Sequence, residues 1–243
     1  MKRIASNMSR INARIAGALY LVIILTATFA ELYVRERLVV YGDAAATAVN
    51  ILAHEPLYRL GGAAMLVALV SDVAVALIFY QLFRPVSKTV SLIAAAFRLM
   101  DVAVLGVNLL NHFAPLIHSK ALGGAFTPDQ LQALSLASLR SYAQGFNIGM
   151  VFFGFNCLLM GYLIFRSAFL PRILGGLMAL AGLSYLTNSF VSFLSPAWAG
   201  NLFPYIMAPP FVAETSLSLW LLAVGLNAER WREQARAAEG NQW

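Results

Sequence analysis

Six long apolar runs constrain this sequence more than any other feature. They cover residues 15–34, 60–83, 89–113, 142–165, 173–194 and 205–227. A helix needs about 20 apolar residues to cross the hydrocarbon core of a bilayer, and each run is long enough. A transmembrane barrel would instead show alternating segments of about 10 residues. The sequence therefore predicts an all-α integral membrane bundle of six transmembrane helices.

The composition excludes several classes of protein. Charged residues make up 12% of the 243 residues and apolar residues 60%, whereas a soluble domain carries about 25% charged residues. A soluble enzyme, a disordered chain and a coiled coil are therefore excluded. The net charge of +6 indicates contact with anionic lipid headgroups, and we expect the lipid bilayer as the partner and no nucleic acid. The single cysteine, Cys157, rules out an intrachain disulfide and a cysteine-based metal site.

The distribution of basic residues predicts the orientation. With the N-terminus inside, the inner segments hold eleven Lys and Arg and the outer segments five, so both termini are predicted to be cytoplasmic. Residues 1–14 then form a cytoplasmic N-terminal segment, 15–227 the transmembrane domain and 228–243 a cytoplasmic tail. A cleaved signal peptide is a second interpretation of the first run, because basic residues precede it and Ala30 ends it. We favour a span, since the run is long for a signal and five more follow.

Two outer loops carry helix-start signals. Asp43 fits the N-cap of a helix over 44–54, which Pro56 would stop. Thr127 and Gln130 form a capping-box pattern with Pro128 at the first helical position. We expect two short amphipathic helices lying at the outer surface.

Several stretches are similar to a known family. They are RIAGALYL at 14–21, the outer-loop run 31–52 with Gly42-Asp43, the run 95–108, LPRILG at 170–175 and PPFVAE at 209–214. They resemble the domain-of-unknown-function 4386 family, which consists of uncharacterised multi-pass membrane proteins, and the resemblance covers nearly the whole chain. It implies a compact protein of the bacterial inner (plasma) membrane with no established activity, and it carries over no catalytic residues.

Four charged residues lie inside the predicted spans. Asp72, Arg98 and Asp101 fall near the midplane and Glu214 somewhat toward the outer side, whereas Glu31 lies near the end of its span and is less surprising. A charge in mid-span costs about 2.5–3.5 kcal/mol on insertion scales, so it marks a structural or functional need.

The third span places its polar residues on one face. Arg98, Asp101, Leu105, Asn108 and His112 are three or four positions apart, which is the spacing of one side of a helix. This stripe would be unfavourable against lipid, so we expect it to point into the bundle.

We expect partners for this stripe on the other spans. Asp72 and Glu214 are the candidate partners of Arg98, and Asn147, Asn156 and Asn188 could complete the network. One arginine against three acids would leave a net charge of about −2 in a low-dielectric interior. We therefore expect a carboxyl that holds a proton, or a cation or water-filled cavity beside it.

The residues leave several functions open. One interpretation of the intramembrane charges is an ion-pair network that only fixes helix register, and another is a site that binds or conducts a small solute or proton. A membrane enzyme acting on a lipid-soluble substrate is a further alternative, as is a protein that regulates a partner. We expect no cofactor and no metal, because His112 and His118 do not share a helix face and no phosphate-binding, HExxH or GxSxG motif occurs.

Overall fold

A computed structural model describes residues 2–121 and 124–240 of the chain. Residue 1 of the expected N-terminal segment and residues 241–243 of the expected tail lie outside the described residues. Within the described part, the chain is helical, has no strand, and contains six helices long and apolar enough to cross a membrane. These spans are Ser9–Leu38, Glu55–Phe83, Lys88–Lys120, Pro128–Arg166, Arg172–Leu194 and Tyr205–Ala223. The prediction of a multi-pass membrane bundle is confirmed.

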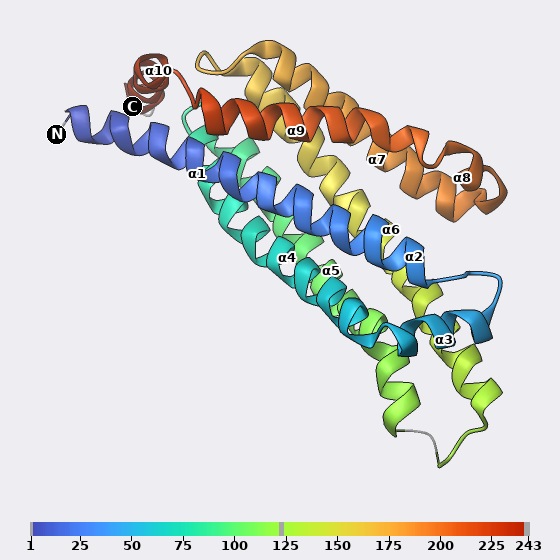
Figure 1. Ribbon diagram of the computed structural model, residues 1–243. Coiled ribbons are helices and arrows are strands. Elements are labelled where there is room, and N and C mark those ends of the chain that lie inside the picture. The colour runs from blue at the N-terminus through green and yellow to red at the C-terminus, as the bar shows by residue number, and fades with distance from the viewer. Residues whose placement is uncertain (1, 122–123, 241–243) are drawn as a thin grey trace.

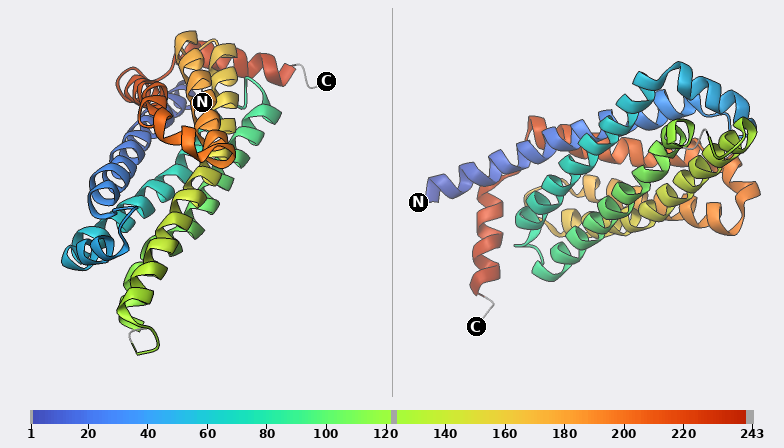
Figure 2. Two further views of the ribbon diagram at one scale, coloured as in Figure 1. Left: turned by 90° about the vertical axis from the view of Figure 1, so that its right-hand side faces the viewer. Right: turned by 90° about the horizontal axis from the view of Figure 1, so that it is seen from below.

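The spanning helices form a closed ring (Figures 1 and 2). They are α1 (Lys2–Thr28) with its extensions η1 (Phe29–Arg35) and α2 (Glu36–Leu38), α4 (Glu55–Phe83), α5 (Lys88–Ala121), α6 (Pro128–Arg166), α7 (Arg172–Leu194) and α9 (Ala208–Ala223). Each helix packs on the next in the order α1, α4, α5, α6, α7, α9, and α9 closes the ring against α1. Short connections force consecutive helices to run antiparallel. The interior of the ring is where helices distant in sequence bring their polar side chains together.

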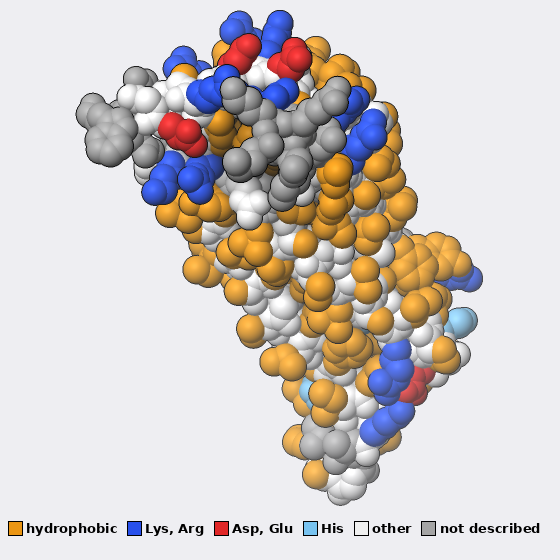
Figure 3. Space-filling view, turned by 90° about the vertical axis from the view of Figure 1, so that its left-hand side faces the viewer, with side chains coloured by type: hydrophobic (Ala, Val, Ile, Leu, Met, Phe, Trp, Pro, Cys, Tyr) orange, Lys and Arg blue, Asp and Glu red, His pale blue; other side chains and the backbone are white. Residues whose placement is uncertain are grey.

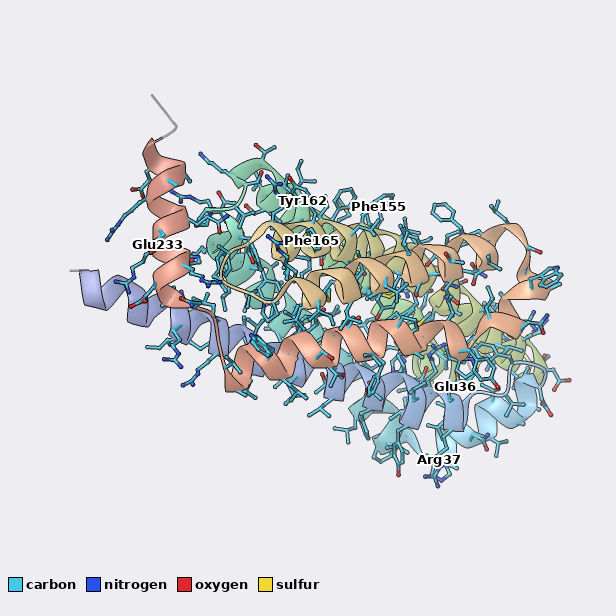
Figure 4. All side chains as sticks on the ribbon, turned by 90° about the horizontal axis from the view of Figure 1, so that it is seen from above. Glu36, Arg37, Phe155, Tyr162, Phe165 and Glu233 are labelled. Atoms are coloured by element: carbon cyan, nitrogen blue, oxygen red, sulfur yellow. The ribbon has the colours of Figure 1, made fainter. Side chains whose placement is uncertain are left out.

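On the face that Figure 3 shows, an apolar belt lies between two charged ends. Large apolar side chains such as Val70 and Leu110 point outward with about 70% of their surface exposed. On α6, Phe155, Tyr162 and Phe165 lie along the outer side (Figure 4). Burying this surface in lipid is favourable because no water then contacts it. The belt therefore places the protein in a membrane.

In both outer loops a helix begins at the predicted cap, but neither helix ends as predicted. The helix α3 (Ala44–Ala53) begins where expected, and the Ala46 N–H donates to Asp43 Oδ1 at 2.9 Å. Pro56 does not stop it, because α3 ends at Ala53 and Pro56 lies in the first turn of α4.

The predicted second surface helix is not a separate element. Thr127 and Gln130 form the capping box, but the helix that starts there continues into the fourth span as one helix, α6. Together α5 and α6 make a hairpin that extends beyond the other helices (Figure 2). A capping box marks where a helix begins and contains no signal for where it ends.

The opposite end gathers both chain termini and the loops that join α4 to α5 and α6 to α7, whereas the connection from α7 to α9, with the helix α8 (Pro196–Leu202), lies at the outer end (Figure 1). The last span ends at Ala223 rather than at 227, and Gly225 adopts a φ of +77° that turns the chain. The tail forms the helix α10 (Ala228–Gly240), which crosses the end of the bundle (Figure 2). Trp231 fixes it there by donating its ring N–H to the Leu82 carbonyl at 2.8 Å.

Candidate functional site

An ion pair lies at the centre of the ring. Arg98 of α5 donates through Nε to Asp72 Oδ1 of α4 at 2.8 Å, and its Nη2 contacts the same oxygen. Arg98 is 1% exposed and Asp72 is 4% exposed. Because neither charge reaches solvent, each depends on the other for its stabilisation.

Aromatic rings from three helices surround the guanidinium of Arg98. Its Cζ lies 4.7 Å from the ring centroid of Tyr20, 5.2 Å from Phe153 and 5.8 Å from Phe79. Such cation–π contacts stabilise a desolvated cation. Arg98 Nη1 nevertheless has no hydrogen-bond partner among the described residues, so one face of the guanidinium keeps an unused donor.

Asp101 lies one helical turn from Arg98 on the same face of α5. It is 3% exposed, and its Oδ1 has no hydrogen-bond partner among the described residues. Gly149 of α6 provides the space that the carboxyl occupies, because a Cβ at that position would lie 2.7 Å from Asp101 Oδ1. Gly149 and Gly145, four residues apart on α6, thus leave space for Asp101 and Asn108 of the polar stripe on α5 and let the two helices approach closely.

Glu214 of α9 is buried in the same core but has a different partner. Its Oε1 accepts a hydrogen bond at 2.5 Å from the hydroxyl of Tyr185 on α7. The ion pair of Arg98 is with Asp72 and not with Glu214. Pro209 and Pro210 lie in the first turn of α9, where the N–H that proline lacks would have no partner within the helix.

The asparagines divide between two levels of the bundle. Asn156 donates to the Ala94 carbonyl at 2.8 Å, and it lines the same narrow space as Arg98, which is too small for a water molecule. Asn188 donates to Asn147 at 3.4 Å and joins α7 to α6 away from the ion pair. The core around Arg98 is therefore closed.

A second polar layer lies toward the outer end. Asn108 donates to the Tyr142 carbonyl at 2.8 Å, and His112 Nε2 lies 3.2 Å from the Tyr58 carbonyl. The His112 and Tyr58 rings stack at 4.2 Å, and the Tyr58 hydroxyl donates to the His112 carbonyl. Because the carbonyl only accepts, Nε2 must carry the proton of the ring. Asn108 thus links α5 to α6, and His112 links α5 to α4.

A third network, around Glu31 and Arg35, was not predicted from the sequence. Glu31 accepts from Arg35 Nε at 2.8 Å and from the Tyr142 hydroxyl at 2.7 Å, and both charged side chains are largely buried. These residues lie in η1, a π-helical turn of the kind often found at functional positions. Burial raises the pKa of Tyr41, which accepts from Arg35 at the edge of this network. The signal for it in the sequence was an acid and a base four residues apart at the end of the first span.

No three His, Cys, Asp or Glu side chains gather as a metal site in the part of the chain that the structure describes. The arrangement instead combines a neutralised ion pair, an unpartnered carboxyl and a carboxyl bound to tyrosine. Such a site can hold and release a proton, since two carboxyls, those of Asp101 and Glu214, have no cation to balance them.

Comparison with known proteins gives the family without an activity. A relative from Archaeoglobus fulgidus, described as an uncharacterized protein, is 25% identical over 169 residues, which cover 70% of this chain and 85% of that protein. No solved structure matches the chain significantly. The model of the family described as "Domain of unknown function (DUF4386)" matches residues 15–225. The chain therefore belongs to the DUF4386 family.

Proposed function

We propose that this protein binds a proton at Asp101 inside the membrane and links that proton to the passage of a small solute. The observation that carries the proposal is the buried, unpartnered Oδ1 of Asp101 beside an ion pair that is already neutral. A carboxylate buried without a partner is costly, and it avoids that cost by taking up a proton. Asp101 is then a neutral acid in the closed state.

Arg98 provides the hydrogen-bond donor that responds to the charge on Asp101. Its Nη1 has no partner among the described residues, and it lies one turn from Asp101 on α5. When Asp101 loses its proton, the new anion attracts this free donor and competes with Asp72 for the guanidinium. Proton release would thereby change the pairing between α4 and α5.

The core is closed on its outer side. The hydrogen bond from Asn108 to Tyr142 and the network of Glu31 with Arg35 lie between Asp101 and the outer end. Passage of a solute requires these contacts to separate. The closed core is the form expected of an occluded state, with the proton bound.

An enzyme acting on a lipid-soluble substrate has less support. It requires acids that face a lateral opening between helices. The groove between α1 and α9 is lined by apolar residues and two threonines, and none of its lining residues is acidic. A purely structural network accounts for Arg98 and Asp72 but leaves the unpartnered Asp101 without a role.

Infrared spectroscopy of the purified protein tests the proton site. The wild-type protein at pH 7 should show the C=O band of a protonated carboxyl, and Asp101→Asn should remove it. Asp129→Asn, which changes an exposed acid at the start of α6, is the matched control and should leave the band unchanged. A spectrum without a protonated-carboxyl band, or a band that disappears in Glu214→Gln and persists in Asp101→Asn, contradicts the proposal.

Proton flux into vesicles tests whether Asp101 carries protons across the membrane. Reconstituted wild-type protein should pass protons under an imposed membrane potential several-fold faster than protein-free vesicles, as reported by a pH-sensitive dye inside. Asp101→Asn should return the flux to background, whereas Asp129→Asn should retain it. Equal flux in the wild-type protein and in Asp101→Asn would show that protons do not pass through this carboxyl.

We further propose that the protein lies in the inner (plasma) membrane with both termini in the cytoplasm. The excess of Lys and Arg on the side of the termini supports this orientation. A green fluorescent protein fused after Trp243 should fluoresce in a bacterial host, and alkaline phosphatase inserted after Gly124 should be active. The opposite pair of results would reverse the orientation.

A further inference from the structure

A long apolar groove opens between α1 and α9 at the end away from the termini. Below it, the two helices touch closely, because the Ser218 hydroxyl donates to the Gly17 carbonyl at 3.0 Å. Above this contact, the groove has a volume of about 580 Å³. Its lining residues are Leu21, Ile24, Leu25, Thr28, Phe29, Leu32 and Tyr33 from α1 and η1, and Phe211 and Thr215 from α9.

The dimensions of the groove match one leaflet of a bilayer. From Leu21 to Tyr33 a helix rises about 18 Å at 1.5 Å per residue. Half of the hydrocarbon core measures about 15 Å. Water would be strongly disfavoured in an apolar space at this depth, so a hydrocarbon chain is the natural occupant.

Two aromatic residues of the groove wall lie beside a cation, Arg37, at the polar end of the groove. The rings of Phe29 and Tyr33 are stacked at 5.4 Å, and Arg37 lies with its Cζ 5.7 Å from the Tyr33 ring. Arg37 also donates to the Tyr33 hydroxyl at 3.3 Å. Figure 4 shows Arg37 at the end of the molecule opposite Glu233 of α10. If the groove spans one leaflet, the stack holds this guanidinium at the level expected of lipid phosphates.

Of the arginines at this end, Arg37 and Arg140 form no ion pair among the described residues, and Arg140 already donates to the Tyr41 carbonyl at 3.1 Å. Arg35 is paired with Glu31, and both Arg59 and Lys120 are paired with Glu55. A smaller groove of about 350 Å³ lies beside Arg59 and Lys120, but Glu55 already neutralises those cations. Arg37 is distinguished by its contact with Tyr33 of the groove wall, and its guanidinium can bind a phosphate through two parallel hydrogen bonds.

We infer that this groove is a binding site for one anionic phospholipid, with an acyl chain between α1 and α9 and the phosphate on Arg37. The site is separate from Asp101 and does not depend on the proposed proton function. Asp101→Asn should therefore bind the lipid as the wild-type protein does.

Native mass spectrometry of the detergent-purified protein titrated with dioleoyl phosphatidylglycerol tests the site. The wild-type protein should bind one lipid saturably. Arg37→Gln should weaken binding about tenfold or more, because glutamine lacks the charge and the paired donors of the guanidinium. Leu25→Trp should abolish this binding, because the larger ring fills the groove. Arg37 and Leu25 are both exposed, so both variants are expected to fold.

Two variants serve as matched controls. Arg59→Gln removes a cation already paired with Glu55, and Leu77→Trp enlarges an outward-facing residue of α4 that is 51% exposed. Both should bind phosphatidylglycerol within twofold of the wild-type protein. The inference is overturned if Arg37→Gln and Leu25→Trp bind as tightly as these controls, or if the controls lose the lipid to the same extent.

Discussion

Replacing Asp72 by leucine is expected to lower the free energy of unfolding by about 3–5 kcal/mol, because Arg98 is then a buried charge without its partner. Arg98→Leu should cost less, since Asp72 can take up a proton when its cation is removed, whereas an arginine in a protein stays charged. The double variant should recover most of the loss, because two apolar side chains replace a desolvated pair. Titration with sodium dodecyl sulfate in mixed micelles measures each free energy.

The pair of Glu55 and Arg59 is the control for this cycle. It has the same chemistry, but the Arg59 side chain is 51% exposed. Exposed pairs contribute about 0–1 kcal/mol, so Glu55→Leu and Arg59→Leu should each have small effects. If the losses at Asp72 and Arg98 simply add in the double variant, the two residues are not held there for each other. The unused donor of Arg98 would then indicate a bound anion.

Gly175→Val is expected to destabilise the protein by about 3 kcal/mol or more, because it forces α6 and α7 apart. A Cβ at Gly175 would lie 2.7 Å from the Gly161 carbonyl oxygen and 2.7 Å from the Phe165 nitrogen. Both are backbone atoms, which cannot move aside as a flexible side chain can. Thermal unfolding in detergent measures the change.

The adjacent glycine is a control with the same chemistry. A Cβ at Gly176 would meet nothing within 4 Å, so Gly176→Val should change the stability by about 0.5 kcal/mol or less. Both variants make the same change to helix propensity, and the difference between them isolates the contact between the helices. Equal losses at the two positions would mean that this close packing does not stabilise the bundle.

The six spans could be predicted because the thickness of the bilayer sets a minimum length for an apolar run. The inward stripe on α5 could also be predicted, since burying Arg98 and Asp101 in lipid would be costly. Counting residues placed Asp72 at the same depth as Arg98, where the structure pairs them. Length and depth are therefore properties that a single sequence contains.

The neighbours of each helix could not be predicted. The hydrogen bond of Glu214 to Tyr185 follows from α7 lying beside α9, and no local pattern specifies that order. The network of Glu31, Arg35 and Tyr142 depends in the same way on η1 meeting α6. The sequence predicts a surface helix and a separate span where the structure has the single helix α6. The first turns of α6 are polar, and a polar stretch is what normally marks the end of a span.

The length of α6 also determines which part of the protein a macromolecule contacts first as it approaches the bilayer. Its 39 residues rise about 58 Å, whereas a bilayer with its headgroups measures about 40–45 Å. With its axis along the bilayer normal and its other end level with the opposite lipid surface, α6 would extend about three helical turns beyond the lipid on one side. A macromolecule that approaches the membrane from that side touches this projection before it reaches the headgroups or the other helices.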